Sequence, residues 1–416
     1  MNFEKIYGYD HIKKELNVII DILNNTEKYQ STGAKLPAGV LLHGAPGLGK
    51  TLFANEFINA LTNRKVYIIR KNKPDGEFVN YLNDTITDAI KCAPAIVFFD
   101  DMDKFANDDE RHRNSEEFVT IQSLIDDAKD KNVFFIATTN DIRNIPASLL
   151  RDGRFDYMYY LNSPEVGDSA KIIEHYLEGK NIASDIDYTE VAKLLQGESC
   201  ATLEKVINEA TIATTYNNKS VIERNDIINA ILRVVYDGPE IDEKNEYAQN
   251  LAIYHEAGHA LVAEMLDKGS VDLVSVGNYF SNKGGITAIS NPDNYWNNLS
   301  SMENRVRVLL AGKAATELYL KTTDLGVSSD LERAQRLITR IIEVYAENNF
   351  NYWAVAGKRS EQKLVQFEND AAQKFESFYF DTKKILLEHR DEYLKIVDLL
   401  KNKKLITQKE LQPIFA

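Results

Sequence analysis

The sequence predicts an α/β domain, in which helices flank a parallel sheet, followed by a small helical subdomain and then by a mainly α-helical domain. Three observations predict this order. Short apolar runs alternate with helical patterns over residues 40–162, residues 168–235 carry helical periodicity alone, and the chain from about residue 246 is again mostly helical. A strand-like interruption near 271–290 is the exception in the last part.

The domain boundaries follow from these changes of pattern. Asp237-Gly238-Pro239 breaks the helical periodicity and is the best linker in the chain. The expected divisions are a large α/β subdomain at 1–162, a helical lid at 163–236, a linker at 237–245 and a helical domain at 246–416.

Composition limits the possible functions. A chain of 416 residues is too long for one ordinary hydrophobic core, so more than one domain is expected. Its 49 basic and 63 acidic residues give a net charge of −14, so we expect no nucleic-acid partner. Cys92 and Cys200 lie in unrelated segments and form no disulfide framework. No apolar run is long enough to cross a bilayer and Met1 begins no signal peptide, so we expect a cytoplasmic chain, or one at the cytoplasmic face of a membrane if it is trimmed.

The α/β pattern can be resolved into elements. Buried strands are predicted at 39–43, 66–69, 95–99 and 133–137, and the helices between them at 50–61, 78–91 and 114–129. This alternation is typical of β-α-β units in a parallel sheet.

A phosphate-binding loop follows the first predicted strand. Its sequence is Gly44-Ala45-Pro46-Gly47-Leu48-Gly49-Lys50-Thr51. Glycines let backbone N–H groups approach phosphates, and the following helix N-terminus favours negative charge. Lys50 is expected to reach the β- and γ-phosphates and Thr51 to hold Mg²⁺. The alternative, a glycine-rich turn without a ligand, is disfavoured by the strand before the loop and the helix after it.

Polar residues follow the next predicted strands. Asp100 is suited to the Mg²⁺ shell, Asp101 to orienting the attacking water, and Asn140 to contacting that water or the γ-phosphate. Arg151 and Arg154 occupy a rigid turn and suit an arginine finger for a neighbouring subunit, although such a pair alone is more often a surface salt-bridge site.

These segments together resemble the AAA+ ATPases. The resemblance also covers Ile6-Tyr7-Gly8-Tyr9-Asp10 at the start and Gly197 to Leu203 in the lid. It implies binding of ATP or ADP with Mg²⁺, nucleotide contacts from Tyr7, Gly8, Leu52 and Ala201, and a ring of six identical subunits. In such a ring Arg151 and Arg154 reach the ATP of the neighbour.

The helical domain begins with a metal-binding pattern, His255-Glu256-Ala257-Gly258-His259. Residues i and i+4 share one helix face, so the two imidazoles can bind Zn²⁺ while Glu256 takes a proton from water. The alternative is a helix with two incidental histidines. Val262 and Met265 stand where a metzincin needs glycine and histidine, and no carboxylate follows about twenty residues later, so the third ligand must come from elsewhere. Asp330 opens a later helix and by itself would be interpreted as an N-cap.

The order of the motifs resembles the FtsH family of ATP-dependent zinc proteases, from Phe3 to about Asn349. The resemblance implies that Asp330 is the third ligand of one zinc ion per subunit, that Gly238 is an interdomain hinge, and that Gly284-Gly285-Ile286-Thr287 is an edge strand for extended substrate. It implies an ATPase and zinc metalloendopeptidase that translocates unfolded or tagged proteins.

Three departures from the family pattern stand out. Asp101 replaces the usual glutamate, which predicts slow ATP hydrolysis with intact binding. Phe78-Val79 is the nearest match to a substrate-gripping pore loop, with Phe78 as the start of a helix's apolar face as the alternative. Transmembrane helices typical of the family do not occur. The competing functions are therefore an ATP-dependent remodeller without effective proteolysis, and a peptidase whose slow ATPase acts as a scaffold.

Overall fold

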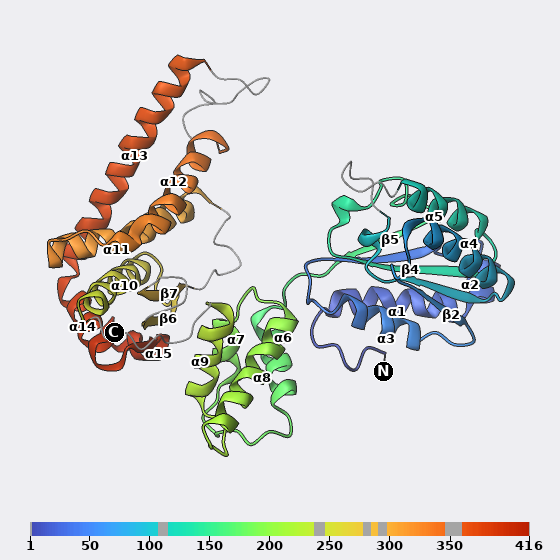
Figure 1. Cartoon of the computed structure of the whole chain (residues 1–416), viewed down its shortest axis with the longest axis horizontal. Helices are drawn as coiled ribbons and strands as arrows, with labels where there is room; N and C mark the ends of the chain where they lie inside the picture. The colour runs from blue at the N-terminus through green and yellow to red at the C-terminus, as the bar shows by residue number, and fades with distance from the viewer. Residues whose placement is uncertain are drawn as a thin grey trace. The chain divides into compact units, whose positions relative to one another are not determined.

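A computed structural model describes residues 2–106, 115–236, 246–277, 284–289, 298–345 and 360–415. These residues form two compact units, 1–222 and 223–416 (Figure 1). The predicted linker at 237–245, with Gly238, lies outside the described residues, and the predicted domain boundaries stay predictions. None of the described helices combines the length and hydropathy that crossing a membrane requires.

The first unit is built on a five-stranded parallel sheet with the order β2-β3-β4-β1-β5, which confirms the predicted α/β fold. The strands are β1 (Gly39–His43), β2 (Lys65–Ile69), β3 (Ala95–Phe99), β4 (Val133–Thr139) and β5 (Tyr157–Tyr160). The sequence did not predict β5, because in this edge strand only Tyr159 is buried and no continuous apolar run marks it.

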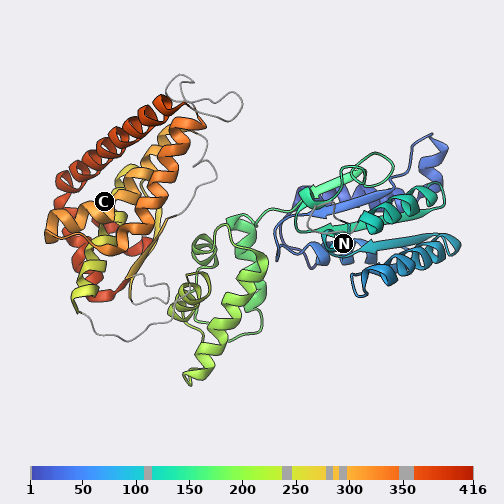
Figure 2. The same cartoon turned by 45° about the horizontal axis from the view of Figure 1, so that its top comes forward.

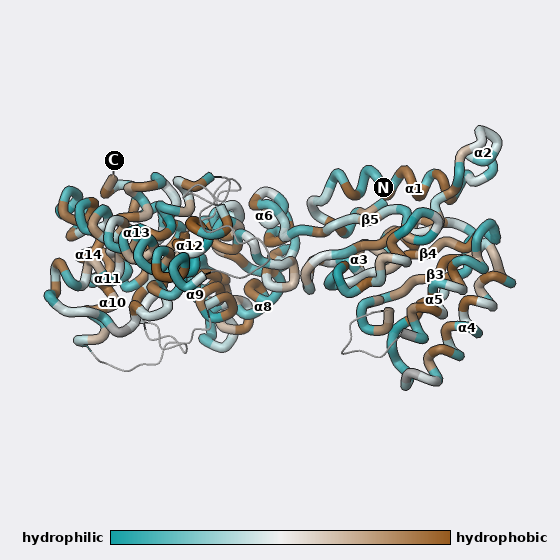
Figure 3. The backbone as a smooth tube through the Cα atoms, turned by 90° about the horizontal axis from the view of Figure 1, so that it is seen from above, coloured by the Kyte–Doolittle hydropathy of each residue, from teal (hydrophilic) through white to brown (hydrophobic). Residues whose placement is uncertain are grey.

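Helices cover both faces of this sheet (Figure 1). The helices are α1 (Asp10–Asn24), α2 (Thr26–Ser31), α3 (Lys50–Asn59), α4 (Asp75–Lys91) and α5 (Ser115–Asp127), with short 3-10 turns η1 (Met102–Lys104) and η2 (Ile142–Asn144). Side chains of α1 and α3 pack against one face, and those of α4 and α5 pack against the other. Hydrophobic and hydrophilic segments alternate along α1, as its single buried face requires (Figure 3).

Phe78 belongs to the hydrophobic core between the sheet and helices α4 and α5. Its side chain is completely buried in α4, with its ring centroid 5.2 Å from that of Phe105. It therefore starts the helix's apolar face, and the hypothesis that it grips substrate is wrong for this conformation.

The same unit continues into three helices, α6 (Val166–Leu177), α7 (Tyr188–Leu194) and α8 (Cys200–Tyr216). The side chain of Ser199 caps α8 by accepting a hydrogen bond from the Thr202 N–H. The start of α8 is thereby held beside the phosphate loop, as described below.

The second unit is mainly helical, as predicted. Its helices are α9 (Arg224–Val235), α10 (Glu246–Leu266), α11 (Leu299–Leu320), α12 (Ser328–Glu343), α13 (Glu361–Glu388), α14 (Arg390–Lys403) and α15 (Gln408–Leu411), with 3-10 turns η3 (Leu325–Val327) and η5 (Gln412–Ile414). The long helix α13 runs beside α11 and α12 (Figure 2).

A small antiparallel sheet lies beside α10 in this unit. Its order is β7-β6-β8, formed by β6 (Val271–Val276), β7 (Gly285–Ile289) and β8 (Leu405–Thr407). β7 therefore lies at an edge of the described sheet, in agreement with the edge strand implied by the family resemblance.

Candidate functional site

Helix α10 carries the two histidines on one face and buries them. His255 and His259 are 6% and 7% exposed, and their Nε2 atoms lie 2.9 Å apart. The close packing of α10 on α11 depends on two glycines. A Cβ on Gly258 would lie 2.7 Å from the Ala311 carbonyl oxygen, and one on Gly312 would lie 2.4 Å from the His255 ring.

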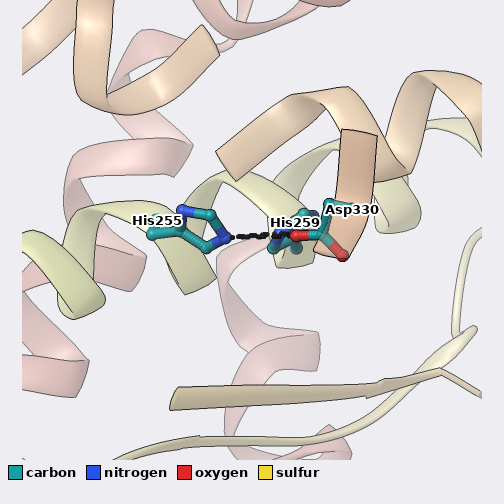
Figure 4. Close-up of side chains that lie close together, drawn as sticks. All are labelled: His255, His259 and Asp330. Carbon is teal, nitrogen blue, oxygen red and sulfur yellow. Dashed lines mark hydrogen bonds and ion pairs between the residues drawn. The ribbon is translucent and has the colours of Figure 1, made fainter. Parts of the chain in front are cut away.

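Asp330 completes the constellation from helix α12 (Figure 4). Its Oδ2 lies 3.4 Å from His255 Nε2 and 3.2 Å from His259 Nε2. Helix α12 begins at Ser328, and the cap position is occupied by Val327. The N-cap interpretation of Asp330 is therefore wrong, and its carboxylate faces the histidines.

The three atoms fit a zinc ion. Ligand atoms about 2.0–2.1 Å from a tetrahedrally coordinated zinc lie roughly 3.3 Å from one another. The observed separations of 2.9, 3.2 and 3.4 Å match that spacing. His259 Nδ1 lies 2.7 Å from the Val308 carbonyl oxygen, which can only accept, so this nitrogen carries the proton and Nε2 is left for a metal.

Glu256 lies beside the metal ligands and is held by strand β7. It is 7% exposed, and its Oε2 accepts a 2.7 Å hydrogen bond from the Thr287 hydroxyl. A Cβ on Gly285 would lie 2.5 Å from Glu256 Cγ, so glycine there leaves room for this side chain. Sequence reasoning did not assign Thr287 this contact, because only folding brings β7 to α10.

These residues line a cavity of about 310 Å³. Its wall includes β7 and the side chains of Arg305 and Arg333. A peptide can add to an edge strand by backbone pairing. The arrangement thus places a candidate metal site, the Glu256 carboxylate and a sheet edge in one cavity.

Acidic neighbours favour the protonated form of His255. Burial would lower the pKa of His255, but interactions with Asp324 and Asp330 outweigh burial and raise that pKa to about 10. Burial would raise the pKa of Asp330, but its interactions with both histidines hold that pKa well below its usual range.

Zinc is therefore expected to bind more tightly as pH rises from about 7 to 9. Zinc needs an unprotonated His255 Nε2, and a pKa near 10 keeps the imidazole protonated over this range. A histidine with its ordinary pKa of about 6.5 would show no such dependence above about pH 7.5. Zinc titrations against a competing chelator at pH 7, 8 and 9 measure the slope, and a constant affinity would contradict the expectation.

The phosphate loop lies between β1 and α3, where it was predicted. Gly44, Gly47 and Gly49 have φ values of 148°, 79° and 85°, which side chains disfavour. A Cβ on Gly44 would lie 2.3 Å from the Leu161 carbonyl oxygen. The Lys50 ammonium donates to the carbonyl oxygens of Gly44 and Ala45 at 2.8 and 2.9 Å, which keeps it inside the loop.

Asp100 and its neighbours form the expected acidic end of β3. Asp100 Oδ1 accepts hydrogen bonds of 3.0 Å from the hydroxyls of Thr51 and Thr138, and Oδ2 accepts one from Arg70. Asp101 instead pairs with Lys104, at 2.6 Å. Sequence reasoning missed Thr138 and Arg70, although the parallel register that pairs Phe99 with Ala137 places Thr138 beside Asp100.

Other predicted nucleotide contacts belong to the same unit. The Ala201 N–H donates to the Gly47 carbonyl oxygen at 3.0 Å, so the start of α8 touches the phosphate loop. Gly8 has a φ of 74°, and a Cβ there would clash with Asp168. The Tyr7 ring lies 5.1 Å from that of His175, and Leu52 is 42% exposed on α3. Asn140 follows β4 directly.

The two arginines of the predicted finger differ in their surroundings. Arg154 donates to both carboxylate oxygens of Asp126, at 3.2 and 2.8 Å, and to the Ser148 carbonyl oxygen. Its side chain is 12% exposed, whereas Arg151 is exposed. Within one chain Arg151 is thus the arginine available to a neighbour, and both roles stay predictions.

Comparisons with known proteins find a family match for each of the two parts of the chain. Residues 40–163 match the model of the ATPase family associated with various cellular activities (AAA), and residues 242–414 match that of peptidase family M41. "ATP-dependent zinc metalloprotease FtsH 2" of Thermoanaerobacter sp. is 29% identical, covering all of this chain and 83% of that protein. "ATP-dependent zinc metalloprotease FtsH 1" of Thermomicrobium roseum is 30% identical to this chain, over all of this chain and 68% of that protein.

Proposed function

Because the chain belongs to the FtsH family of ATP-dependent zinc metalloproteases, we propose that it uses ATP hydrolysis to deliver unfolded protein segments to its zinc site for cleavage. The observation that carries the proposal is the convergence of His255, His259 and Asp330 beside Glu256. A metal site that serves structure alone needs no carboxylate base next to its ligands.

The peptidase residues have separate roles in this proposal. His255, His259 and Asp330 hold zinc, and bound zinc supplies Lewis acidity, which polarises a carbonyl and lowers the pKa of water. Glu256 takes the proton of the attacking water and transfers it to the leaving amine. The Thr287 hydroxyl holds one carboxylate oxygen of Glu256, and the edge of β7 aligns the peptide.

The ATPase residues divide in the same way. N–H groups of the loop from Gly44 to Thr51 and the Lys50 ammonium bind phosphates, while Thr51 and Asp100 hold Mg²⁺. Asp101 and Asn140 orient water, and Arg151 serves the neighbouring subunit of a homohexamer, whereas Arg154 holds its own turn through Asp126. The hydrogen bond between Thr51 and Asp100 supports the assignment of the magnesium ligands.

We propose that the chain works in the cytoplasm. Its two cysteines form no disulfide, which fits a reducing compartment.

One observation favours a slower variant of this function, in which nucleotide binding acts as a scaffold. The Asp101 carboxylate is one methylene shorter than a glutamate and is drawn to Lys104 at 2.6 Å. Such a chain would cleave loosely folded proteins with little dependence on hydrolysis.

Degradation of casein and of a tagged, stably folded protein by the zinc-loaded full chain tests the proposal. Each is incubated with ATP and with a non-hydrolysable analogue. Cleavage of the folded substrate in ATP alone supports coupled proteolysis. Cleavage of casein alone, with either nucleotide, supports the scaffold. If an assembled, zinc-loaded chain cleaves neither substrate, the proposal of proteolysis is overturned. The alternative of an ATP-dependent remodeller then remains.

Asp101→Glu is expected to raise the ATPase turnover, by up to about 100-fold, without changing the KM for ATP. The added methylene moves the carboxylate towards the attacking water, and a displacement of about 1 Å can change a rate by about 100-fold. Steady-state ATPase assays measure the effect. Asp100→Glu is the matched control and should lower turnover, because Thr51 and Thr138 hold the Asp100 carboxylate in place. Unchanged turnover in Asp101→Glu would show that the aspartate does not limit the reaction.

A further inference from the structure

One nitrogen of the proposed zinc site lacks a well-aligned hydrogen bond. His255 Nδ1 is among the few buried side-chain polar atoms of the described residues that have no hydrogen-bond partner. The corresponding nitrogen of His259 meets the Val308 carbonyl oxygen at 2.7 Å. The two ligands are therefore supported differently.

The carboxylate of Asp324 lies close to this nitrogen. Its Oδ2 lies 3.3 Å from His255 Nδ1, and its side chain is 21% exposed. Its other oxygen, Oδ1, accepts a 2.9 Å hydrogen bond from the Gly326 N–H, which fixes the carboxylate at the start of the 3-10 turn η3. This turn leads directly into α12, which carries Asp330.

We propose that Asp324 is a positioning residue for the metal centre, whose carboxylate accepts the Nδ1–H of His255 and directs Nε2 towards zinc. The proposal rests on the assignment of His255 as a zinc ligand. A metal ligand must present an unprotonated nitrogen, so its proton lies on the other nitrogen and needs an acceptor. Asp324 provides that acceptor and adds a negative charge beside a divalent cation.

The same segment would then supply both a ligand and its support. Asp324, at the start of η3, orients His255, while Asp330, in the following helix α12, binds the zinc ion. Partners of this kind change metal affinity by about 10- to 100-fold when they are removed. The expected consequence is therefore measurable as zinc binding, without reference to proteolysis.

The test is the zinc affinity of Asp324→Asn in the metal-stripped full chain, measured by competition with a fluorescent chelator. Asparagine keeps an oxygen for the Gly326 N–H and removes the charge that supports His255. We expect zinc binding, compared at a pH high enough that proton competition at His255 does not contribute, to weaken about 10- to 100-fold. Glu332→Gln, which removes an exposed charge on α12 away from His255, is the matched control and should bind zinc like the unchanged chain.

Two results would overturn the proposal: an affinity of Asp324→Asn within about twofold of the unchanged chain, or equal weakening by Glu332→Gln. Asp324→Ser is a second variant, since its hydroxyl can cap η3 but is too short to reach the imidazole, and it should weaken binding as much. If the unchanged chain binds no zinc, and His255→Ala behaves like it in the same assay, the assignment of the zinc site fails. The proposed function then fails, rather than the role of Asp324 alone.

Discussion

Glu256→Gln is expected to reduce peptide-bond hydrolysis by about 10²- to 10⁴-fold while leaving zinc binding intact. Glutamine has nearly the same shape and can keep the contact with the Thr287 hydroxyl, but it cannot take a proton from water. Because Glu256 is only 7% exposed, bulk water has little access to replace it as the proton acceptor. Cleavage of a fluorogenic casein and the zinc content of the same preparation are the two measurements.

Glu246→Gln, at the exposed start of the same helix, is the matched control and should cleave casein normally. ATPase activity should be unchanged in both variants, because the two sites lie in different units of the chain. If Glu256→Gln keeps more than a tenth of the activity with its zinc in place, another group acts as the base.

If the chain forms the proposed ring, Arg151→Ala is expected to lower ATP hydrolysis by about 10³- to 10⁵-fold, with the subunit still folded. An arginine supplied to a neighbour's ATP contributes this much to turnover. Arg151 is exposed in the single chain, so its removal should not change the melting temperature. ATPase assays and thermal unfolding measure the two effects, and Arg143→Ala at another exposed turn is the control.

Mixed rings show whether the arginine acts between subunits. Arg151→Ala subunits keep their own phosphate loop, and Lys50→Ala subunits keep Arg151. Combining the two inactive proteins should restore part of the ATPase activity, because some interfaces then contain both intact residues. No restoration in rings that have been shown to mix would contradict a role in the neighbour's site.

Arg154→Ala is expected to behave differently from Arg151→Ala. Its guanidinium is bound to Asp126 and to the Ser148 carbonyl oxygen, so its loss should destabilise the α/β unit. Hydrogen bonds to charged groups contribute about 1.5–3 kcal/mol, and the lower end applies because Asp126 is partly exposed. A lowered melting temperature separates this structural effect from the catalytic effect of Arg151.

Much of the fold could be predicted because its signals are local. Strands β3 and β4 are buried on both faces and therefore appear as continuous apolar runs in the sequence. The phosphate loop depends on glycines and on Lys50 within eight consecutive residues. Edge strand β5 escaped prediction because it buries only one side chain, so its pairing with β1 leaves no apolar run.

The sequence by itself determined the pair His255 and His259 with Glu256 between them, because a helical turn places residues i and i+4 on one face whatever surrounds them. Only the tertiary structure decided the remainder of the site. Packing of α12 places the carboxylate of Asp330, which the family resemblance implies as a third ligand, against the two histidines, and packing of η3 brings Asp324 to Nδ1 of His255. The same physical reason applies in every case: contacts between distant segments depend on how elements pack, and no local spacing encodes that packing.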